Sequence, residues 1–288
     1  MSVDLIIQGE DIASADLRAL HDIVSANGIE RISHVAHQAF RLCNAEDGEA
    51  SRAAVKSRCD SAQLDFAFVI SGRTLGNIGL LAMDMDSTLI TIECIDEIAD
   101  FTGKKAEVSA VTASAMRGEI DWPESLRQRV ALLAGLEASA LQRVYDERLK
   151  LSPGAEILIA AAKKNGVKLL LVSGGFTFFT ERLKARLNVD YAFANVLEIV
   201  NGKLTGNVIG PFCDADSKAR HLRETAAALL LPRERCIAIG DGANDLKMMN
   251  AAGLSVAYRA KPVVQAQATL AINHVGLDGV LALFSLDH

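Results

Sequence analysis

Two aspartates separated by a single residue, Asp84 and Asp86, carry the clearest chemistry in this chain of 288 residues. They follow the apolar run 78–83, which is typical of a buried parallel strand. Ligands of open α/β sheets bind at the carboxyl ends of the strands. A carboxylate placed there can attack a phosphoryl group, provided that a cation offsets the repulsion between the two anions. Considered alone, the pair is also compatible with an Asx turn that closes the strand.

Three further segments place polar groups at the ends of predicted elements. Residues 173–175 (Ser-Gly-Gly) follow the apolar strand 169–172, and residues 241–245 (Asp-Gly-Ala-Asn-Asp) follow the strand 237–240. Lys218 lies near the start of a helix-like stretch. In chain order the segments are a double aspartate, a hydroxyl with glycines, a lysine and an acidic cluster. Each segment is a weak signal alone, whereas the ordered set is a strong one.

In this order the four segments resemble the motifs of the haloacid dehalogenase superfamily of phosphohydrolases. The similarity extends from about Leu80 to near the C-terminus and is closest to the phosphoserine phosphatases of that superfamily. The resemblance implies a Mg²⁺-dependent enzyme that hydrolyses O-phospho-L-serine to L-serine and phosphate through an aspartyl-phosphate, as the final step of serine biosynthesis.

The chemistry and the resemblance together predict the catalytic residues. Asp84 is the expected nucleophile, because an ionised carboxylate needs no base. Asp86, at the position to which the family assigns acid and base catalysis, is expected to protonate the leaving alkoxide and then to deprotonate the attacking water, which requires a raised pKa or a shared proton. Ser173 and Lys218 are expected to bind the charged phosphoryl oxygens, together with backbone N–H groups at Gly174, at the start of a helix.

The acidic residues predict a metal site. Mg²⁺ prefers hard oxygen ligands in an octahedron, and Asp84 and Asp241 offer carboxylates for it. The resemblance adds the backbone carbonyl of Asp86 as a ligand. Asp245 is expected to lie one helical turn beyond Asp241 and to support the ligands from behind, and Asn244 is expected to orient phosphate or lysine. The residues alone also allow a tight turn at Asp241 and a helix-start charge at Asp245.

The resemblance alone predicts the residues that select the substrate. Glu93 matches the glutamate that holds the substrate ammonium, and Arg129 matches the arginine that grips the carboxylate with its forked guanidinium. Met116 and Trp122 match positions that close over the ligand, although the family usually has Phe where this chain has Trp122. The residues alone leave Arg129 open as a solvated helix charge, which is the expectation for Arg127.

The segments around these motifs predict a doubly wound, mostly parallel α/β sheet over residues 73–288. A largely helical insertion at about 92–151 interrupts it, and the resemblance identifies this insertion as the cap of the family. An insertion directly after the nucleophile strand is well placed to cover the site. Residues 195–210, with Asn-Gly at 201–202, predict a β-hairpin.

Residues 1–72 predict a small α+β unit in the order strand, helix, two strands, helix, strand, which ends at a polar, glycine-bearing joint. This βαββαβ order resembles the small-molecule-sensing ACT domains, although residues 8–11 only partly match their ligand turn. Effector sensing and a dimerisation or packing role both stay open, so a homodimer through this unit is one expected assembly. His34 and His37 are expected on a strand or turn surface rather than in a metal site, which would need further ligands.

Composition limits the remaining functions. A net charge of −6 argues against a nucleic-acid binder that uses a basic face. No apolar run approaches the ~18 residues of a membrane span, and the N-terminal residues do not match a secretory signal. The five scattered cysteines include no Cys-x-x-Cys pair, which is typical of a reducing compartment. We therefore expect a cytoplasmic protein that binds a small-molecule substrate, without nucleic-acid or membrane partners.

Two other functions stay open at this point. The first is a phosphotransferase or phosphatase of the same superfamily that acts on another small phosphomonoester. The second is an amino-acid-sensing regulatory protein whose core is only a scaffold. The intact set of Asp84, Asp86, Ser173, Lys218 and Asp241 speaks against the scaffold, because a scaffold does not need all of these residues.

Overall fold

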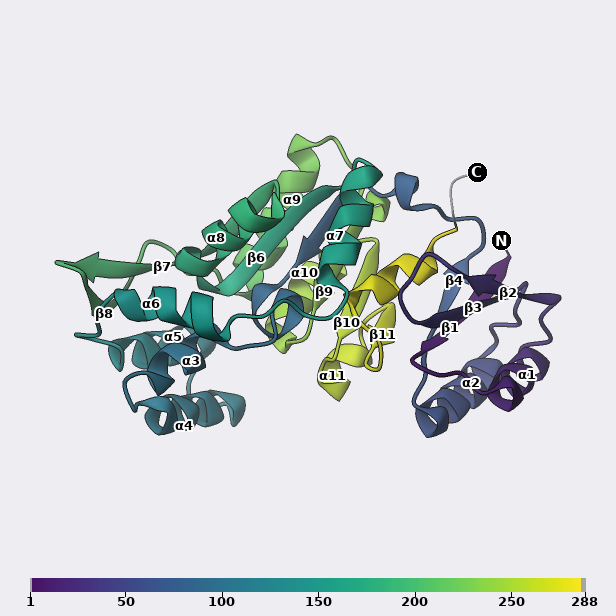
Figure 1. Ribbon diagram of the computed structural model, residues 1–288, viewed down its shortest axis with the longest axis horizontal. Coiled ribbons are helices and arrows are strands. Elements are labelled where there is room, and N and C mark those ends of the chain that lie inside the picture. The colour runs from purple at the N-terminus through teal and green to yellow at the C-terminus, as the bar shows by residue number, and fades with distance from the viewer. Residues whose placement is uncertain (1, 286–288) are drawn as a thin grey trace.

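The computed structural model describes residues 2–285, apart from the side chain of Met116, and contains two separate sheets (Figure 1). The first is a four-stranded antiparallel sheet with the order β2-β3-β1-β4. Its elements, in chain order, are β1 (Val3–Gly9), α1 (Ser14–Ile23), β2 (Gly28–Ile32), β3 (Gln38–Cys43), α2 (Glu49–Ala62) and β4 (Asp65–Ile70). The predicted βαββαβ order is confirmed, and this small sheet fits an ACT-like domain.

Both faces of the four-stranded sheet are covered, which explains why almost every residue of β1 is buried. On one face, Leu5 and Ile7 belong to a core that includes residues of α1 and α2. On the other face, Ile6, Ala67 and Val69 belong to the apolar core that continues into the second part of the chain. The N-terminal sheet is therefore packed between its own helices and the C-terminal segment, beside which it lies in Figure 1.

Polar contacts reinforce this docking. The carboxylate of Asp65 accepts hydrogen bonds from the backbone N–H groups of Asn273, His274 and Val275 at 2.8–3.1 Å. His37 lies 3.4 Å from the carboxylate of Asp278, and its side chain is only 4% exposed. The expectation of a surface position is therefore wrong for His37, because the turn between β2 and β3 packs against the C-terminal segment.

The second sheet has seven strands in the order β11-β10-β9-β5-β6-β7-β8 and is parallel from β11 to β7. The strands are β5 (Leu80–Met83), β6 (Lys168–Phe176), β7 (Tyr191–Val200), β8 (Lys203–Ile209), β9 (Cys236–Gly240), β10 (Leu254–Tyr258) and β11 (Leu270–Ile272). The helices are α7 (Ala155–Lys164), α8 (Thr177–Leu187), α9 (Ala215–Ala228), α10 (Leu246–Ala251) and α11 (Pro262–Gln265), followed by a 3₁₀ segment (Leu277–Leu283).

Helices cover both faces of this sheet, so the predicted doubly wound fold is confirmed. Along β5, Leu81 and Met83 face one apolar core while Leu80 and Ala82 face another. The strand β5 lies between β9 and β6, and the first motif therefore follows a central strand. The predicted hairpin is confirmed as β7 and β8, which pair antiparallel at the edge.

The insertion between β5 and α7 is helical and lies at one end of the molecule (Figure 1). It contains α3 (Cys94–Asp100), α4 (Lys105–Met116), α5 (Trp122–Ala131) and α6 (Ser139–Arg143), which continues into a π-helical turn (Val144–Arg148). An isolated antiparallel bridge pairs Ile90 with Leu151 where the chain leaves and re-enters the core. Within residues 2–285, no helix combines the length and the hydrophobicity that crossing a membrane requires.

Candidate active site

The carboxyl ends of the neighbouring strands β9, β5 and β6 bring the predicted catalytic residues to one edge of the sheet. Asp84 follows β5, Ser173 lies in the last part of β6, and Asp241 follows β9. Carboxylate oxygens of Asp84, Asp241 and Asp245 all lie within 4.8 Å of one another. Parallel pairing aligns these strand ends, so the sheet itself gathers residues that are up to 161 positions apart.

Lys218 links two of these carboxylates. Its Nζ lies 2.8 Å from Oδ2 of Asp84 and 2.7 Å from Oδ1 of Asp245, and its side chain is 1% exposed. Burial alone would lower the pKa of Lys218, but the charges of Asp245 and Asp84 raise it above its ordinary value. The ammonium therefore stays protonated beside Asp84. The second oxygen of Asp84, Oδ1, accepts a hydrogen bond of 2.7 Å from the N–H of Met85.

Asp86 lies beside Ser173 and is not part of the cluster of Asp84, Asp241 and Asp245. Its Oδ1 accepts a hydrogen bond from the N–H of Cys94 at 3.3 Å. A Cβ at Gly175 would lie 2.7 Å from Oδ2 of Asp86 and 3.0 Å from Oγ of Ser173, so only glycine fits between them. Burial, and then the charge of Glu93, raise the pKa of Asp86 to about 7. This value meets the requirement for a group that first donates a proton and later accepts one.

Asp241 has a partner that the sequence analysis did not single out. The hydroxyl of Thr88 donates to Oδ1 of Asp241 at 3.1 Å. Thr88 is fully buried and lies four residues after Asp84. No local spacing signal marks Thr88, because its partner lies 153 positions further along the chain. Burial and the charge of Asp245 raise the pKa of Asp241 to about 6.

Asp245 is fully buried, and both of its oxygens already have partners. Oδ1 accepts from Lys218 at 2.7 Å, and Oδ2 accepts from the N–H of Gly242 at 3.0 Å. The expectation that Asp245 lies one turn beyond Asp241 on the same helix is wrong. Residues 243–245 form a 3₁₀ turn and α10 begins at Leu246, because the side chain of Asp245 folds back onto the preceding loop.

The carboxylate cluster fits a divalent cation. Burial, and then the charge of Asp245, raise the pKa of Asp84 well above its ordinary value. Crowding of this kind is relieved when a cation binds between carboxylates, which are the ligands that Mg²⁺ prefers. Asp84 and Asp241 are the side chains that were expected to offer ligands, and both belong to this cluster together with Asp245. The side chain of Asp86 lies outside this cluster, and only its backbone carbonyl was expected to contribute.

Ser173 is fully buried, and its Oγ accepts a hydrogen bond from the N–H of Gly175 at 2.8 Å, which leaves the hydroxyl hydrogen for a phosphate oxygen. The expectation that Gly174 lies at a helix start is wrong. The strand β6 continues to Phe176, where it pairs with β7 again after a bulge, and α8 begins only at Thr177. Backbone N–H groups at this position therefore belong to a strand bulge.

The cap positions two of the predicted specificity residues near this edge. Oε1 of Glu93 accepts a hydrogen bond from Ser87 at 2.6 Å. Glu93 is exposed to solvent on one side, and desolvation of its carboxylate by the surrounding protein raises its pKa. Burial lowers the pKa of Arg129, whereas the nearby charges of Asp96, Glu93 and Asp86 oppose that shift, which places Arg129 among acidic groups. In contrast, the side chain of Arg127 is 57% exposed, as expected.

Trp122, at the start of α5, contacts the core. A Cβ at Gly174 would lie 3.0 Å from Cζ2 of Trp122, and the indole packs edge-on against Phe212 with ring centroids 6.4 Å apart. The cap therefore lies directly over the bulge of β6. Oδ1 of Asn244 lies close to Gly242, where a Cβ would be 2.1 Å away. The side chain of Met116 lies outside the part of the chain that the structure describes.

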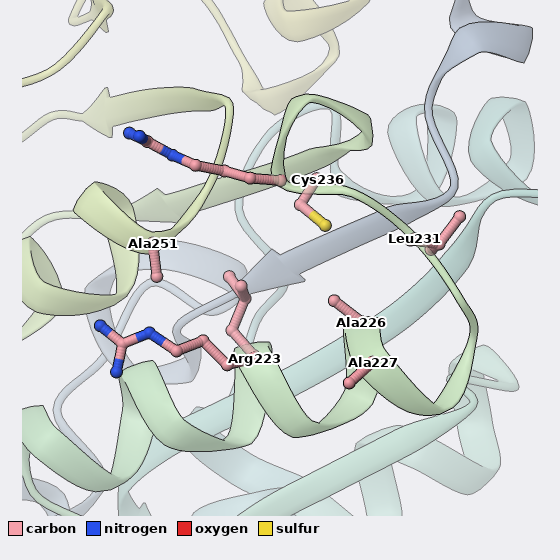
Figure 2. A pocket seen from close by; sticks show the side chains of 8 residues that line it. Arg223, Ala226, Ala227, Leu231, Cys236 and Ala251 are labelled. Atoms are coloured by element: carbon pink, nitrogen blue, oxygen red, sulfur yellow. The ribbon is translucent and has the colours of Figure 1, made fainter.

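A surface cavity of about 180 Å³ lies elsewhere, between α9, α10 and the start of β9. Figure 2 shows the residues that line it, among them Arg223, Leu231, Cys236 and Ala251. None of the predicted site residues is part of this lining, so the cavity is separate from the catalytic edge.

Comparison with known proteins supports the fold and shows the family. The family model described as haloacid dehalogenase-like hydrolase matches residues 81–250, and a domain of unknown function (DUF4072) matches residues 5–55. The phosphoserine phosphatase of Polaromonas sp. is 56% identical over 73% of this chain and 91% of its own length.

Solved structures agree over nearly the whole chain. A HAD family hydrolase from Salmonella enterica serovar Typhi superposes with a TM-score of 0.91 and 32% identity, and the match covers 99% of each chain. A probable phosphoserine phosphatase from Vibrio cholerae superposes with a TM-score of 0.82 and 39% identity, covering 97% of this chain and 85% of its own.

Proposed function

The chain belongs to the haloacid dehalogenase-like hydrolase family, and from this premise we propose that it is a phosphoserine phosphatase that uses Mg²⁺. It is an enzyme that hydrolyses phosphomonoesters, and its substrate is a small molecule. The single observation that carries the proposal is the buried contact of Lys218 with Asp84 at the end of the central strand, with Asp86 and Ser173 beside it.

The proposed reaction has two steps, and both of them use Asp84 and Asp86. In the first, the carboxylate of Asp84 attacks phosphorus, the ester P–O bond breaks, and Asp86 transfers its proton to the departing serine oxygen. In the second, Asp86 accepts a proton from water while that water attacks the phosphorus of the aspartyl-phosphate. The Asp84–phosphorus bond then breaks and inorganic phosphate leaves. A pKa of about 7 suits Asp86 to both proton transfers.

Lys218 and Ser173 bind the non-bridging oxygens of the phosphoryl group, where charge is largest. Gly174 contributes backbone N–H groups, and Asn244 orients the phosphate. Asp84, Asp241 and the backbone carbonyl of Asp86 would hold Mg²⁺, and Asp245 would support them from behind. When bound, Mg²⁺ supplies the positive charge that lets an anionic nucleophile approach an anionic substrate.

Selection of phosphoserine is assigned to the cap. Glu93 pairs with the substrate ammonium and Arg129 with its carboxylate, while Trp122 and Met116 close over the ligand. The half-buried position of Arg129 near Glu93 supports this assignment, because it puts an acidic and a basic group of the cap close together, as the ammonium and the carboxylate of one substrate require. We assign catalysis to residues 73–288, with the cap at about 92–151.

Residues 1–72 are assigned a regulatory or dimerisation role, and a homodimer through this domain is the proposed assembly. A cytoplasmic location follows from the proposed place in serine biosynthesis. The five free cysteines are consistent with a reducing compartment.

The proposal is tested by measuring phosphate release from L-phosphoserine and from a panel of other phosphomonoesters, with and without Mg²⁺. We expect phosphoserine to be the preferred substrate. The variant Asp84→Asn should lose several orders of magnitude in kcat while staying folded, and beryllium fluoride should attach to Asp84 only in the wild type. Equal rates across the panel would contradict the substrate, and an active Asp84→Asn would contradict the mechanism.

A further inference from the structure

The bulge that presents Ser173 interrupts the hydrogen-bond ladder between β6 and β7. The two strands pair in register up to Val172 and Phe193, and they pair again only at Phe176 and Asn195. Residues 173–175 are therefore three residues of β6 that face a single residue of β7. A bulge lacks the regular ladder bonds, so another group must hold its backbone in place.

The side chain of Asn195 provides that support. Its Nδ2 donates to the carbonyl oxygens of Gly174 at 2.8 Å and Gly175 at 3.3 Å. Its Oδ1 accepts a hydrogen bond from the N–H of Cys213 at 2.9 Å. The residue is 1% exposed. The amide is thus fully buried and pairs on both of its ends with backbone groups from two different segments.

The second of these segments leads directly to the catalytic lysine. Cys213 precedes Asp214, whose Oδ1 accepts from the N–H of Ser217 at 2.8 Å and so caps the helix α9. Ser217 in turn donates its hydroxyl to the carbonyl of Phe212 at 2.9 Å. Lys218 lies in the first turn of α9, so a shift of residues 212–214 would move its ammonium.

We propose that Asn195 is a positioning residue that sets the distance between the Ser173 bulge and the Lys218 helix, so that both groups reach one phosphoryl group. The inference rests on the proposed function and deepens it. Asn195 acts only through backbone groups, and it has no direct contact with the reacting atoms. An asparagine suits this position because one end must donate to carbonyls while the other accepts from an N–H.

The variant Asn195→Asp tests the proposal with almost no change in shape. One carboxylate oxygen still accepts from the N–H of Cys213, whereas the other faces the carbonyl oxygens of Gly174 and Gly175 and repels them. Since a displacement of about 1 Å in a catalytic site costs about 10²-fold in rate, we expect kcat per folded molecule to fall by about 10–100-fold. The inhibition constant of inorganic phosphate should rise about tenfold or more.

The substrate preference distinguishes a positioning role of Asn195 from a general loss of structure in the active site. Glu93 and Arg129 lie in the cap, so the preference for phosphoserine over phosphoethanolamine should stay unchanged in Asn195→Asp. The matched control is Asn165→Asp, because Asn165 is an exposed asparagine at the end of α7 whose amide donates only to its own helix. The control should keep wild-type values. Wild-type kcat and phosphate inhibition in Asn195→Asp, or a changed substrate preference, would overturn the proposal.

A second variant tests the proposal if Asn195→Asp does not fold. Asn195→Ser keeps a hydroxyl that reaches one of the two segments but not both, and it should show the same loss of kcat and of phosphate affinity. If neither variant folds, Asn195 serves folding and the positioning role is refuted. p-Nitrophenyl phosphate serves as a second substrate, so that the effect of Asn195 is still measured if the wild type fails to hydrolyse phosphoserine.

Discussion

Truncation of Arg129 to alanine provides the sharpest test of substrate choice. The Nε of Arg129 donates to the carbonyl of Ser125 at 3.3 Å, which leaves its terminal nitrogens for a substrate carboxylate. Each charge-assisted hydrogen bond contributes about 1.5–3 kcal/mol when water is excluded. A bidentate pair therefore contributes about 3–6 kcal/mol. Since about 1.4 kcal/mol corresponds to a tenfold change in kcat/KM, the value for phosphoserine should fall by about 10²–10⁴-fold.

The comparison substrate isolates this contact. Phosphoethanolamine has the same phosphate and ammonium but no carboxylate, so Arg129→Ala should change its kcat/KM by much less than tenfold. Glu93→Gln should show the complementary pattern, with a large loss on substrates that carry an ammonium and little loss on glycerol phosphate. The two variants together thus assign one substrate group to each side chain.

The assay is phosphate release at several substrate concentrations, with the folded fraction of each variant measured by circular dichroism. Arg143→Ala is the matched control, because Arg143 is an exposed arginine of the cap that pairs with Glu147 and lies over the ring of Phe101, neither of which is a predicted site residue. It should match the wild type on every substrate. Equal losses of Arg129→Ala on phosphoserine and phosphoethanolamine would refute the reasoning, since Arg129 would then hold the cap and not the carboxylate.

Two further predictions concern the metal and the docked N-terminal sheet. A chelator should abolish activity and Mg²⁺ should restore it. Asp241→Asn should raise the half-saturating Mg²⁺ concentration at least tenfold. Full activity in the presence of chelator would contradict the proposed metal site. Asp65→Ala leaves three N–H groups without an acceptor, that of Val275 buried and those of Asn273 and His274 partly buried, so the free energy of unfolding should fall by about 3 kcal/mol. Denaturant titration measures this change. The control is Asp60→Ala, because Asp60 is an exposed aspartate of α2 that pairs only with Lys56. Equal stability of the two variants would show that the three hydrogen bonds of Asp65 contribute nothing.

The sequence alone determined which elements form and which residues carry the chemistry. Apolar runs and turn residues predicted the strand before Asp84, the strand before Ser173 and the hairpin after Asn195, because each of these depends on local spacing along the chain. The ordered motifs predicted that Asp84, Ser173, Lys218 and Asp241 belong together. Parallel strands bring their carboxyl ends to one edge, so order along the chain is sufficient for that conclusion.

Only the tertiary structure decided how the groups are held. The contacts of Thr88 with Asp241 and of Asn195 with Cys213 join residues that are 153 and 18 positions apart, and nothing in local spacing marks them. The bulge at Ser173 and the turn before α10 likewise differ from the helical starts that were predicted. At Asp241 and at the bulge, a side chain from another segment pairs with carboxylate or backbone groups that would otherwise lack a partner. Such pairing depends on distances in space, which the sequence does not contain.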